Sequence, residues 1–343
     1  MSSIFITLPD GSKQEVSAGS SPLDVARSIS PRLAESAIAA KVNGELFDLT
    51  RPLEADATVE ILTTRSSEAL PIYRHSTAHL LAAAVLELFP ETRLGIGPAT
   101  DTGFYYDFQR EQPFTPEDLE AIESRMWDLQ KRDLPYERKL TPKSEGLKKY
   151  AAMGEELKCQ LIDEKASDEF TEYTLGDKFI DFCRGPHVPS TGKIKAFKLL
   201  SIAGAYWKGD EKNAQMQRIY GTAFFVKKEL DAYLAQIEEA KKRDHRKLGQ
   251  ELDLFSIQEL AGPGLIFFHP KGGTVRRILE DWMRDQYVKR GYSLVYTPHI
   301  ARSDLWKTSG HYNFYGENMF KRMELDDAEY QLKPMNCPFH ILI

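Results

Sequence analysis

A short stretch from Arg74 to Val85 constrains this chain more than any other, because it predicts a helix and places two imidazoles on it. It reads Arg-His-Ser-Thr-Ala-His-Leu-Leu-Ala-Ala-Ala-Val and is rich in alanine and leucine, the strongest helix formers. His75 and His79 are four residues apart, so on a helix they share one face, one turn apart. Two imidazoles placed in this way can hold a metal, activate a water molecule or bind a phosphate.

A second pair of polar side chains occurs much later, in the segment Asp181-Phe-Cys-Arg-Gly-Pro-His187. Cys183 and His187 are again four apart, but Gly185 and Pro186 disfavour a continuous helix, so the pattern predicts a turn or loop. Two histidines with a cysteine and a third histidine have the residue types of a tetrahedral metal site. Spacing alone leaves two readings open, a shared polar site or separate surface and capping residues.

The length of 343 residues predicts two or three domains. Hydrophobic content of 42% and charged content of 28% are typical of a soluble globular protein, and no apolar run is long enough to span a bilayer. The first residues lack the features of a signal peptide. Three cysteines fit a reducing compartment, so we expect a cytoplasmic protein with no membrane partner. The net charge of −6 means that any RNA contact depends on local basic patches.

Residues 1–63 are expected to form a small α+β domain with four or five strands around one helix. Ser21 and Pro22 mark the helix start, and Asn43-Gly44 predicts a hairpin turn. The expected strands cover residues 3–8, 13–16, 37–42 and 58–62. The pattern resembles the TGS domain, a ubiquitin-like β-grasp module found in several RNA-handling proteins. A generic interaction module remains the alternative.

Residues 64–226 are expected to form a second α+β domain that opens with the histidine helix. Thr115 is expected to cap a helix that runs to about Arg132, with Met126 and Trp127 in the core. The remaining expectations are a strand over 103–107, a helix over 142–153, and strands over 158–162 and 170–175.

Four motifs in this region carry a family resemblance: His75-Ser-Thr-Ala-His79, Cys183-Arg-Gly-Pro-His187, residues 203–210 and Arg218-Ile-Tyr-Gly-Thr222. They resemble the editing domain of bacterial threonyl-tRNA synthetases, and alanyl-tRNA synthetases share the histidine and cysteine–histidine pairs more distantly. The order of a TGS module, an editing domain and a class II core is also similar to the threonyl family.

The resemblance implies roles for individual residues of an editing site. His75 and Lys158 would orient a water molecule and the ester, although Lys158 alone reads as a solvated strand lysine. His79, Asp181, Cys183 and His187 would shape the pocket and hold the terminal adenosine and serine, and Tyr106, Tyr206 and Trp207 would line it. Alanyl relatives bind zinc with this set and threonyl relatives work without it, so we expect a metal-free site.

Residues 227–248 are expected to form a linker helix that carries the basic run from Lys241 to Lys247. Such a run is usually a solvated face. Between an editing unit and a catalytic unit it could also lie along a tRNA backbone.

Residues 249–343 are expected to form part of a class II catalytic domain with an antiparallel sheet. A strand over 265–268, a helix over 274–289 and a strand over 290–298 resemble motif 1, which forms the dimer interface of the family. Leu305-Trp-Lys-Thr-Ser-Gly-His311 and Lys333-Pro-Met-Asn-Cys-Pro338 are specific for the threonyl family. The resemblance makes Met335 a substrate-binding residue and Cys337 a zinc ligand. Phe339 departs from the family, which usually has glycine there.

Motifs 2 and 3, the two histidine ligands of that zinc and the anticodon-binding domain do not occur in this sequence. We therefore expect an N-terminal portion of a longer enzyme that neither activates threonine alone nor holds a stable structural zinc. The incomplete sheet and the apolar segment from Phe339 to Ile343 predict that this unit folds poorly or associates.

The resemblance as a whole implies a threonine–tRNA ligase. The complete enzyme would use threonine, ATP with Mg²⁺, a core Zn²⁺ and tRNA(Thr), act as a homodimer, and hydrolyse mischarged Ser-tRNA(Thr). Editing is needed because a pocket discriminates one methyl group by only about 10–200-fold. Two alternatives stay open, a free-standing Ser-tRNA deacylase acting in trans and a TGS-containing RNA-binding regulatory protein. The intact histidine and cysteine set counts against a degenerate site.

Overall fold

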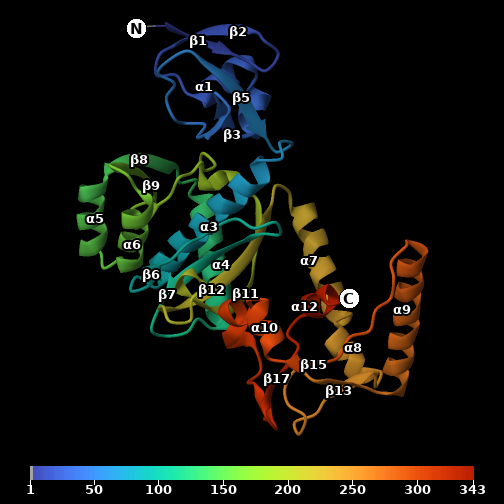
Figure 1. Ribbon diagram of the computed structural model, residues 1–343. Helices are drawn as coiled ribbons and strands as arrows, with labels where there is room; N and C mark the ends of the chain where they lie inside the picture. Colours follow the sequence, from blue (N-terminus) through green and yellow to red (C-terminus); the bar gives the residue numbers. More distant parts are fainter. Residues whose placement is uncertain (1–2) are drawn as a thin grey trace. The chain divides into compact units, whose positions relative to one another are not determined.

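A computed structural model describes residues 3–343 (Figure 1). The chain divides into two compact units, Met1–Ala240 and Lys241–Ile343. Among the described residues, no helix is long and apolar enough to cross a membrane.

The N-terminal region forms a five-stranded sheet and the predicted helix, with a second short helix that was not predicted. The sheet has the order β2-β1-β5-β3-β4, with β1 and β5 parallel and the other neighbours antiparallel. Ser21 caps α1 in a capping box with Asp24, and Pro22 is its first residue, as predicted. A second short helix follows directly. The elements are β1 (Ser3–Thr7), β2 (Lys13–Ser17), α1 (Pro22–Ile29), α2 (Pro31–Ser36), β3 (Ala37–Val42), β4 (Glu45–Phe47) and β5 (Ala57–Thr63).

The Asn43-Gly44 turn confirms the predicted hairpin. Both residues have positive φ, 52° and 86°, and the flanking Val42 and Glu45 pair across the two strands. This is the backbone of a two-residue type I′ turn, for which Asn-Gly is the preferred sequence.

The rest of the first unit is built around α3, which is buried along most of its length. The helix contacts α4 and the strands β7 and β12 of a four-stranded antiparallel sheet with the order β11-β12-β7-β6 (Figure 1). A three-stranded sheet, β10-β9-β8, carries the predicted cysteine loop at the end of β10. The elements are α3 (Ala69–Leu88), β6 (Arg93–Leu94), β7 (Phe104–Gln109), α4 (Pro116–Lys131), β8 (Tyr136–Pro142), α5 (Lys143–Ala152), α6 (Glu156–Lys165), β9 (Glu169–Leu175), β10 (Phe179–Phe182), η1 (Thr191–Lys193), β11 (Ala196–Tyr206), η2 (Trp207–Gly209) and β12 (Gln215–Phe224).

The core of this region confirms the predicted helix from Thr115. Thr115 caps α4 through a capping box with Asp118. Met126 is fully buried, and Trp127 packs against the core with its ring stacked on Phe197 at 4.1 Å between centroids. The helix therefore serves packing, as expected from its apolar face.

The prediction of a strand over 158–162 is wrong, because these residues lie in helix α6. Leu157, Cys159 and Leu161 alternate with polar residues and so imitate a strand in a short window. In the helix, Lys158 and Ile162 are one turn apart and are both buried. Burial of the helix face that carries Lys158 and Ile162 therefore favours the helix over a strand.

The linker helix is also interrupted, contrary to the prediction. Helix α7 (Lys227–Lys242) ends within the basic run, and Asp244 then caps α8 (His245–Glu251) by accepting the backbone N–H of Arg246. An aspartate at this position favours a new helix start over continuation.

The second unit contains the predicted helix α9, but residues 291–298 form no strand in the described structure. An extended segment becomes a strand only with a hydrogen-bonded neighbour, and here Tyr292 and Tyr296 are exposed. The ring of Phe339 is buried against Trp306, 5.6 Å between centroids. The expectation that this unit folds poorly or associates stays a prediction. Its elements are β13 (Phe255–Ile257), β14 (Ile266–Phe268), α9 (Pro270–Lys289), β15 (Ile300–Arg302), α10 (Asp304–Thr308), α11 (His311–Tyr315), η3 (Gly316–Asn318), β16 (Met323–Leu325), β17 (Ala328–Leu332) and α12 (Cys337–Ile341).

Candidate functional site

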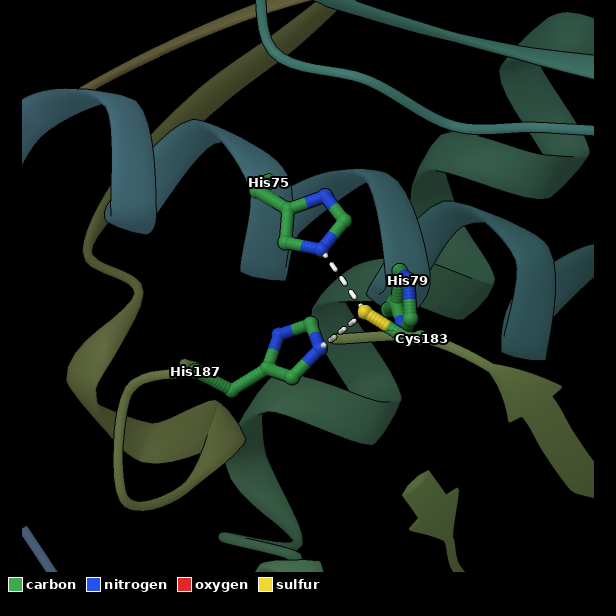
Figure 2. A group of neighbouring side chains, drawn as sticks. All are labelled: His75, His79, Cys183 and His187. Carbon is green, nitrogen blue, oxygen red and sulfur yellow. Dashed lines mark hydrogen bonds between the residues drawn. The ribbon is translucent and has the colours of Figure 1, made fainter. Parts of the chain in front are cut away.

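The structure brings the two predicted pairs of side chains together. Helix α3 supplies His75 and His79, and the loop after β10 supplies Cys183 and His187. One potential ligand atom from each residue lies within 4.8 Å of all the others. Figure 2 shows the sulfur of Cys183 between the rings of His75 and His187, with His79 beside them.

Hydrogen bonds fix the tautomer of His75. Its Nδ1 lies 3.0 Å from the carbonyl oxygen of Gly97, which only accepts, so Nδ1 carries the proton. Nε2 of the neutral ring is then an acceptor, and it lies 3.0 Å from Sγ of Cys183. The thiol of Cys183 therefore donates to His75.

A similar count fixes the tautomer of His187. The Ser76 hydroxyl donates to the carbonyl of Ile72 at 2.8 Å and accepts the N–H of Val188 at 3.0 Å. Nδ1 of His187, 3.1 Å from the same hydroxyl, must then donate to it. Nε2 of His187 is consequently an acceptor that points at Sγ of Cys183 at 3.4 Å. Two acceptor nitrogens thus face one thiol.

Burial keeps these four groups neutral. Desolvation lowers the pKa of His75 below its usual value, and it lowers the pKa of His79 and His187 much further. Burial also raises the pKa of the Cys183 thiol to about 12. At neutral pH the cluster therefore holds three uncharged imidazoles and a thiol.

A buried ion pair lies beside the cluster. Lys158 and Asp181 are 1% and 2% exposed and form a close salt bridge, so the expectation of a solvated Lys158 is wrong. The hydroxyl of Tyr106 donates to Oδ2 of Asp181 at 2.5 Å, and Nε2 of His79 lies 3.6 Å from the same oxygen. The low dielectric around this pair strengthens every interaction that the lysine makes.

His75, His79, Lys158, Asp181 and Cys183 line a cavity of about 240 Å³. Tyr106, which was predicted to line the pocket, is fully buried and is not among its lining residues, and neither is His187. A cavity of this size accommodates a small acyl group. The lining residues are His75, His79, Ile96, Gly97, Pro98, Lys158, Leu161, Asp181, Phe182 and Cys183.

Two of the residues predicted to line the pocket lie elsewhere. Tyr206 is 45% exposed, and Trp207 is buried in a separate cluster with Leu157 and Met216. Their place in a glycine-rich strand motif was not enough to predict the direction of the side chains, because β11 ends at Tyr206 and a 3₁₀ turn begins at Trp207.

Two residues that shape the site, Ser76 and Gly97, were not predicted from the sequence. Ser76 follows His75 directly, so its place in the motif was an available signal. Gly97 could also have been noticed, because it belongs to a Gly-Ile-Gly-Pro segment. In the structure, a Cβ atom at position 97 would lie only 2.1 Å from the ring of Tyr106. Gly97 therefore lets the backbone come close enough to bond His75.

Met335 and Cys337 of the second unit lie outside this site. Cys337 is exposed at the start of α12, and Met335 is partly exposed just before it. Within residues 3–343, one group of neighbouring side chains has the composition and spacing of a metal site, and it consists of His75, His79, Cys183 and His187. Cys337 is not part of this group.

Two family models match the regions described above. The TGS domain model matches residues 4–63, and the model of the threonyl and alanyl tRNA synthetase second additional domain matches residues 171–220. The second match covers the loop of Cys183 and His187, strand β11 and the first part of β12.

Curated relatives extend the similarity to the whole chain. Threonine--tRNA ligase of Acidobacterium capsulatum is 53% identical over 99% of this chain and 55% of its own length. The enzyme of Pelobacter propionicus is 55% identical over 100% of this chain and 54% of its own. The chain belongs to the threonine–tRNA ligase family. It spans about half the length of these relatives.

A solved structure of the RNA binding domain of threonyl-tRNA synthetase from Cryptosporidium parvum Iowa II is 46% identical to this chain. The match covers 29% of this chain and 25% of that one, with a TM-score of 0.28, which is too low for the folds to be compared.

Proposed function

We propose that residues 64–226 hydrolyse the seryl ester of mischarged tRNA(Thr), and that the complete protein is a class II threonine–tRNA ligase. Family membership supports the ligase activity, with ATP, threonine and tRNA(Thr) as its substrates. The observation that carries the hydrolytic function is the neutral cluster of His75, His79, Cys183 and His187. The first three of these residues line one small cavity together with the Lys158–Asp181 pair.

The chemistry assigned to this cavity is attack of a water molecule on the ester carbonyl. The thiol of Cys183 first turns from Nε2 of His75 to Nε2 of His187, which lies 3.4 Å from its sulfur, and this frees the lone pair of His75. The water oxygen then bonds to the seryl carbonyl carbon and gives its proton to Nε2 of His75, which is held as an acceptor by the bond from Nδ1 to Gly97. The ester C–O bond then breaks, and the proton is delivered to the ribose oxygen that leaves. Free serine and uncharged tRNA are the products.

Lys158 is placed to stabilise the negative charge that develops on the carbonyl oxygen. It is a buried donor, 1% exposed, that lines the cavity, and such stabilisation is strongest where water is excluded. Its salt bridge to Asp181, and the bond from Tyr106 to Asp181, hold its position. The role of His79 and His187 is then to pack around and orient these groups.

The second unit supports the proposal of a partial catalytic domain. In the complete enzyme, Cys337 would provide one thiolate ligand to a core zinc that binds the substrate threonine, near Met335. ATP with Mg²⁺ and a homodimer through the class II core belong to the same proposal, and this portion alone is not expected to activate threonine.

We also propose that the editing site works without a metal. In a tetrahedral zinc site the nitrogen and sulfur ligands are about 3.5 Å apart for the bond lengths that zinc prefers. The 3.0 Å distance from Nε2 of His75 to Sγ of Cys183 is instead that of a direct hydrogen bond.

We expect the purified chain to contain much less than one zinc ion per molecule, and its hydrolytic activity to survive a chelator. Elemental analysis together with deacylation after chelation measures both. Stoichiometric zinc, with activity that is lost on chelation and restored by zinc, would show a metal site instead.

The proposed activity is tested with purified tRNA(Thr) charged with serine or with threonine. The chain is expected to release serine at a rate well above the uncatalysed reaction and to spare the threonine ester. Equal, background-level hydrolysis of both esters would contradict the editing function, and would leave the TGS-containing regulatory protein as the better reading.

The rate of deacylation is expected to stay constant as the pH falls through 6.5 and to decline only at lower pH. Water activation needs neutral His75, and desolvation lowers the pKa of His75 below its ordinary value of 6.5. Protonation, and with it the loss of activity, is therefore displaced to lower pH. A single-turnover pH profile measures this, and a midpoint at or above 6.5 would contradict the assigned base.

A further inference from the structure

The side chain of Asp48 belongs to the TGS domain but bonds to the loop of the hydrolytic site. Asp48 follows β4 and is 7% exposed. Its Oδ1 accepts the backbone N–H of His187 at 2.9 Å, and its Oδ2 accepts the hydroxyl of Tyr173 at 2.7 Å. Both oxygens of a buried carboxylate are thus used on the other domain.

The TGS domain holds Asp48 rigidly. The backbone carbonyl of Asp48 accepts the N–H of Arg51 at 3.2 Å, which closes a turn. The next residue, Leu49, is 1% exposed, and its carbonyl accepts the N–H of Leu23 at the start of α1. The position of the carboxylate is therefore set by the TGS core rather than by the loop that it contacts.

The bonds from Asp48 complete the fixation of the loop that carries Cys183 and His187. The N–H of Gly185 donates to Sγ of Cys183 at 3.3 Å, and the N–H of Val188 donates to Ser76. Asp48 is the acceptor for the N–H of His187 between them. A buried N–H without an acceptor is costly, so this bond favours one loop conformation.

Asp48 also acts on the imidazole of His187 through Tyr173. The His187 ring stacks on Tyr136 at 5.0 Å between centroids, and Tyr173 packs edge-on at 4.5 Å. The hydroxyl of this same Tyr173 donates its hydrogen bond to Asp48. The carboxylate of Asp48 therefore fixes His187 in two ways: directly through its backbone N–H, and through Tyr173, which packs against its ring.

We propose that Asp48 is a positioning residue of the hydrolytic site, which aligns His187 and, through it, Cys183. The TGS domain is then a part of the editing site and not only an attached module. This inference rests on the proposed function for its effect on rate, and on the loop geometry for its effect on His187.

The test uses the full 343-residue chain and the substitution Asp48→Ala. The substitution leaves the buried N–H of His187 without its acceptor and is expected to lower the single-turnover rate of Ser-tRNA(Thr) hydrolysis by about 10–100-fold. The concentration of tRNA for half-maximal rate is expected to stay near that of the parent, because Asp48 is buried. Asp48→Asn keeps an oxygen for the N–H of His187 and is expected to recover much of the rate.

Glu54→Ala is the matched control, since Glu54 is an exposed acid of the same domain. The ¹⁵N and ¹H signals of His187, followed by selective labelling of the eight histidines, are expected to move in Asp48→Ala and not in Glu54→Ala. Tyr173→Phe removes only the second bond and is expected to have a smaller effect. It also carries the test if Asp48→Ala fails to fold.

Two results would overturn the inference: parental rate with unmoved His187 signals in Asp48→Ala, or weaker tRNA binding with an unchanged maximal rate. If the parent chain itself fails to hydrolyse the ester, the proposed function falls. The His187 signals then still decide whether Asp48 positions the loop.

Discussion

We expect His75→Ala to lower the rate of Ser-tRNA(Thr) hydrolysis by about 10²–10⁴-fold, the usual contribution of a positioned base. The substitution removes the acceptor nitrogen that faces the cavity and leaves the other side chains of the quartet in place. The fold is expected to survive, because alanine suits a helix and the Cys183 thiol can turn to Nε2 of His187.

Single-turnover deacylation measures the loss, and circular dichroism with thermal melting measures the fold. His299→Ala, at an exposed histidine of the second unit, is the matched control and should behave as the parent. A His75→Ala variant that is fully folded and hydrolyses at the parental rate would remove His75 from the mechanism.

The sequence could predict each half of the site, because short-range rules govern it. The spacing of His75 and His79 on an alanine-rich helix places them on one face, and Gly185-Pro186 requires a loop between Cys183 and His187. The contact between the two pairs depends on long-range packing, which residue spacing cannot predict. Only the family resemblance indicated that the pairs form one site. The same limit hid Asp48, since nothing in its local sequence indicates a partner 139 positions away.

Local patterns failed where tertiary contacts decide the conformation. Apolar and polar residues alternate over 157–161 as in a strand, yet these residues form a helix that buries Leu157, Lys158 and Ile162. Residues 291–298 have strand composition but no hydrogen-bonded neighbour in the described structure. In both cases the missing information is the identity of the packing partner, as with strand propensity in general.

The largest effect on stability is expected from Lys158→Ala. This change leaves the Asp181 carboxylate buried beside Tyr106 without its cation, and breaking a buried pair in this way costs about 3–5 kcal/mol in the free energy of unfolding. Hydrolysis should also be lost, because the donor to the developing oxyanion is removed. Lys165→Ala, at an exposed lysine on the same helix α6, is the control and should have little effect.

A double substitution separates the two roles of the lysine. Lys158→Met with Asp181→Asn replaces the ion pair by neutral groups of similar size, and the asparagine oxygen can still accept the Tyr106 hydroxyl. Replacing both members of a buried pair is often neutral for stability, so we expect the urea midpoint to return toward that of the parent. Activity should stay absent, since no cation faces the cavity. Recovered hydrolysis in the double variant would show that Lys158 supports the fold and not the reaction; an unfolding midpoint as low as that of Lys158→Ala would show that the ion pair itself is required.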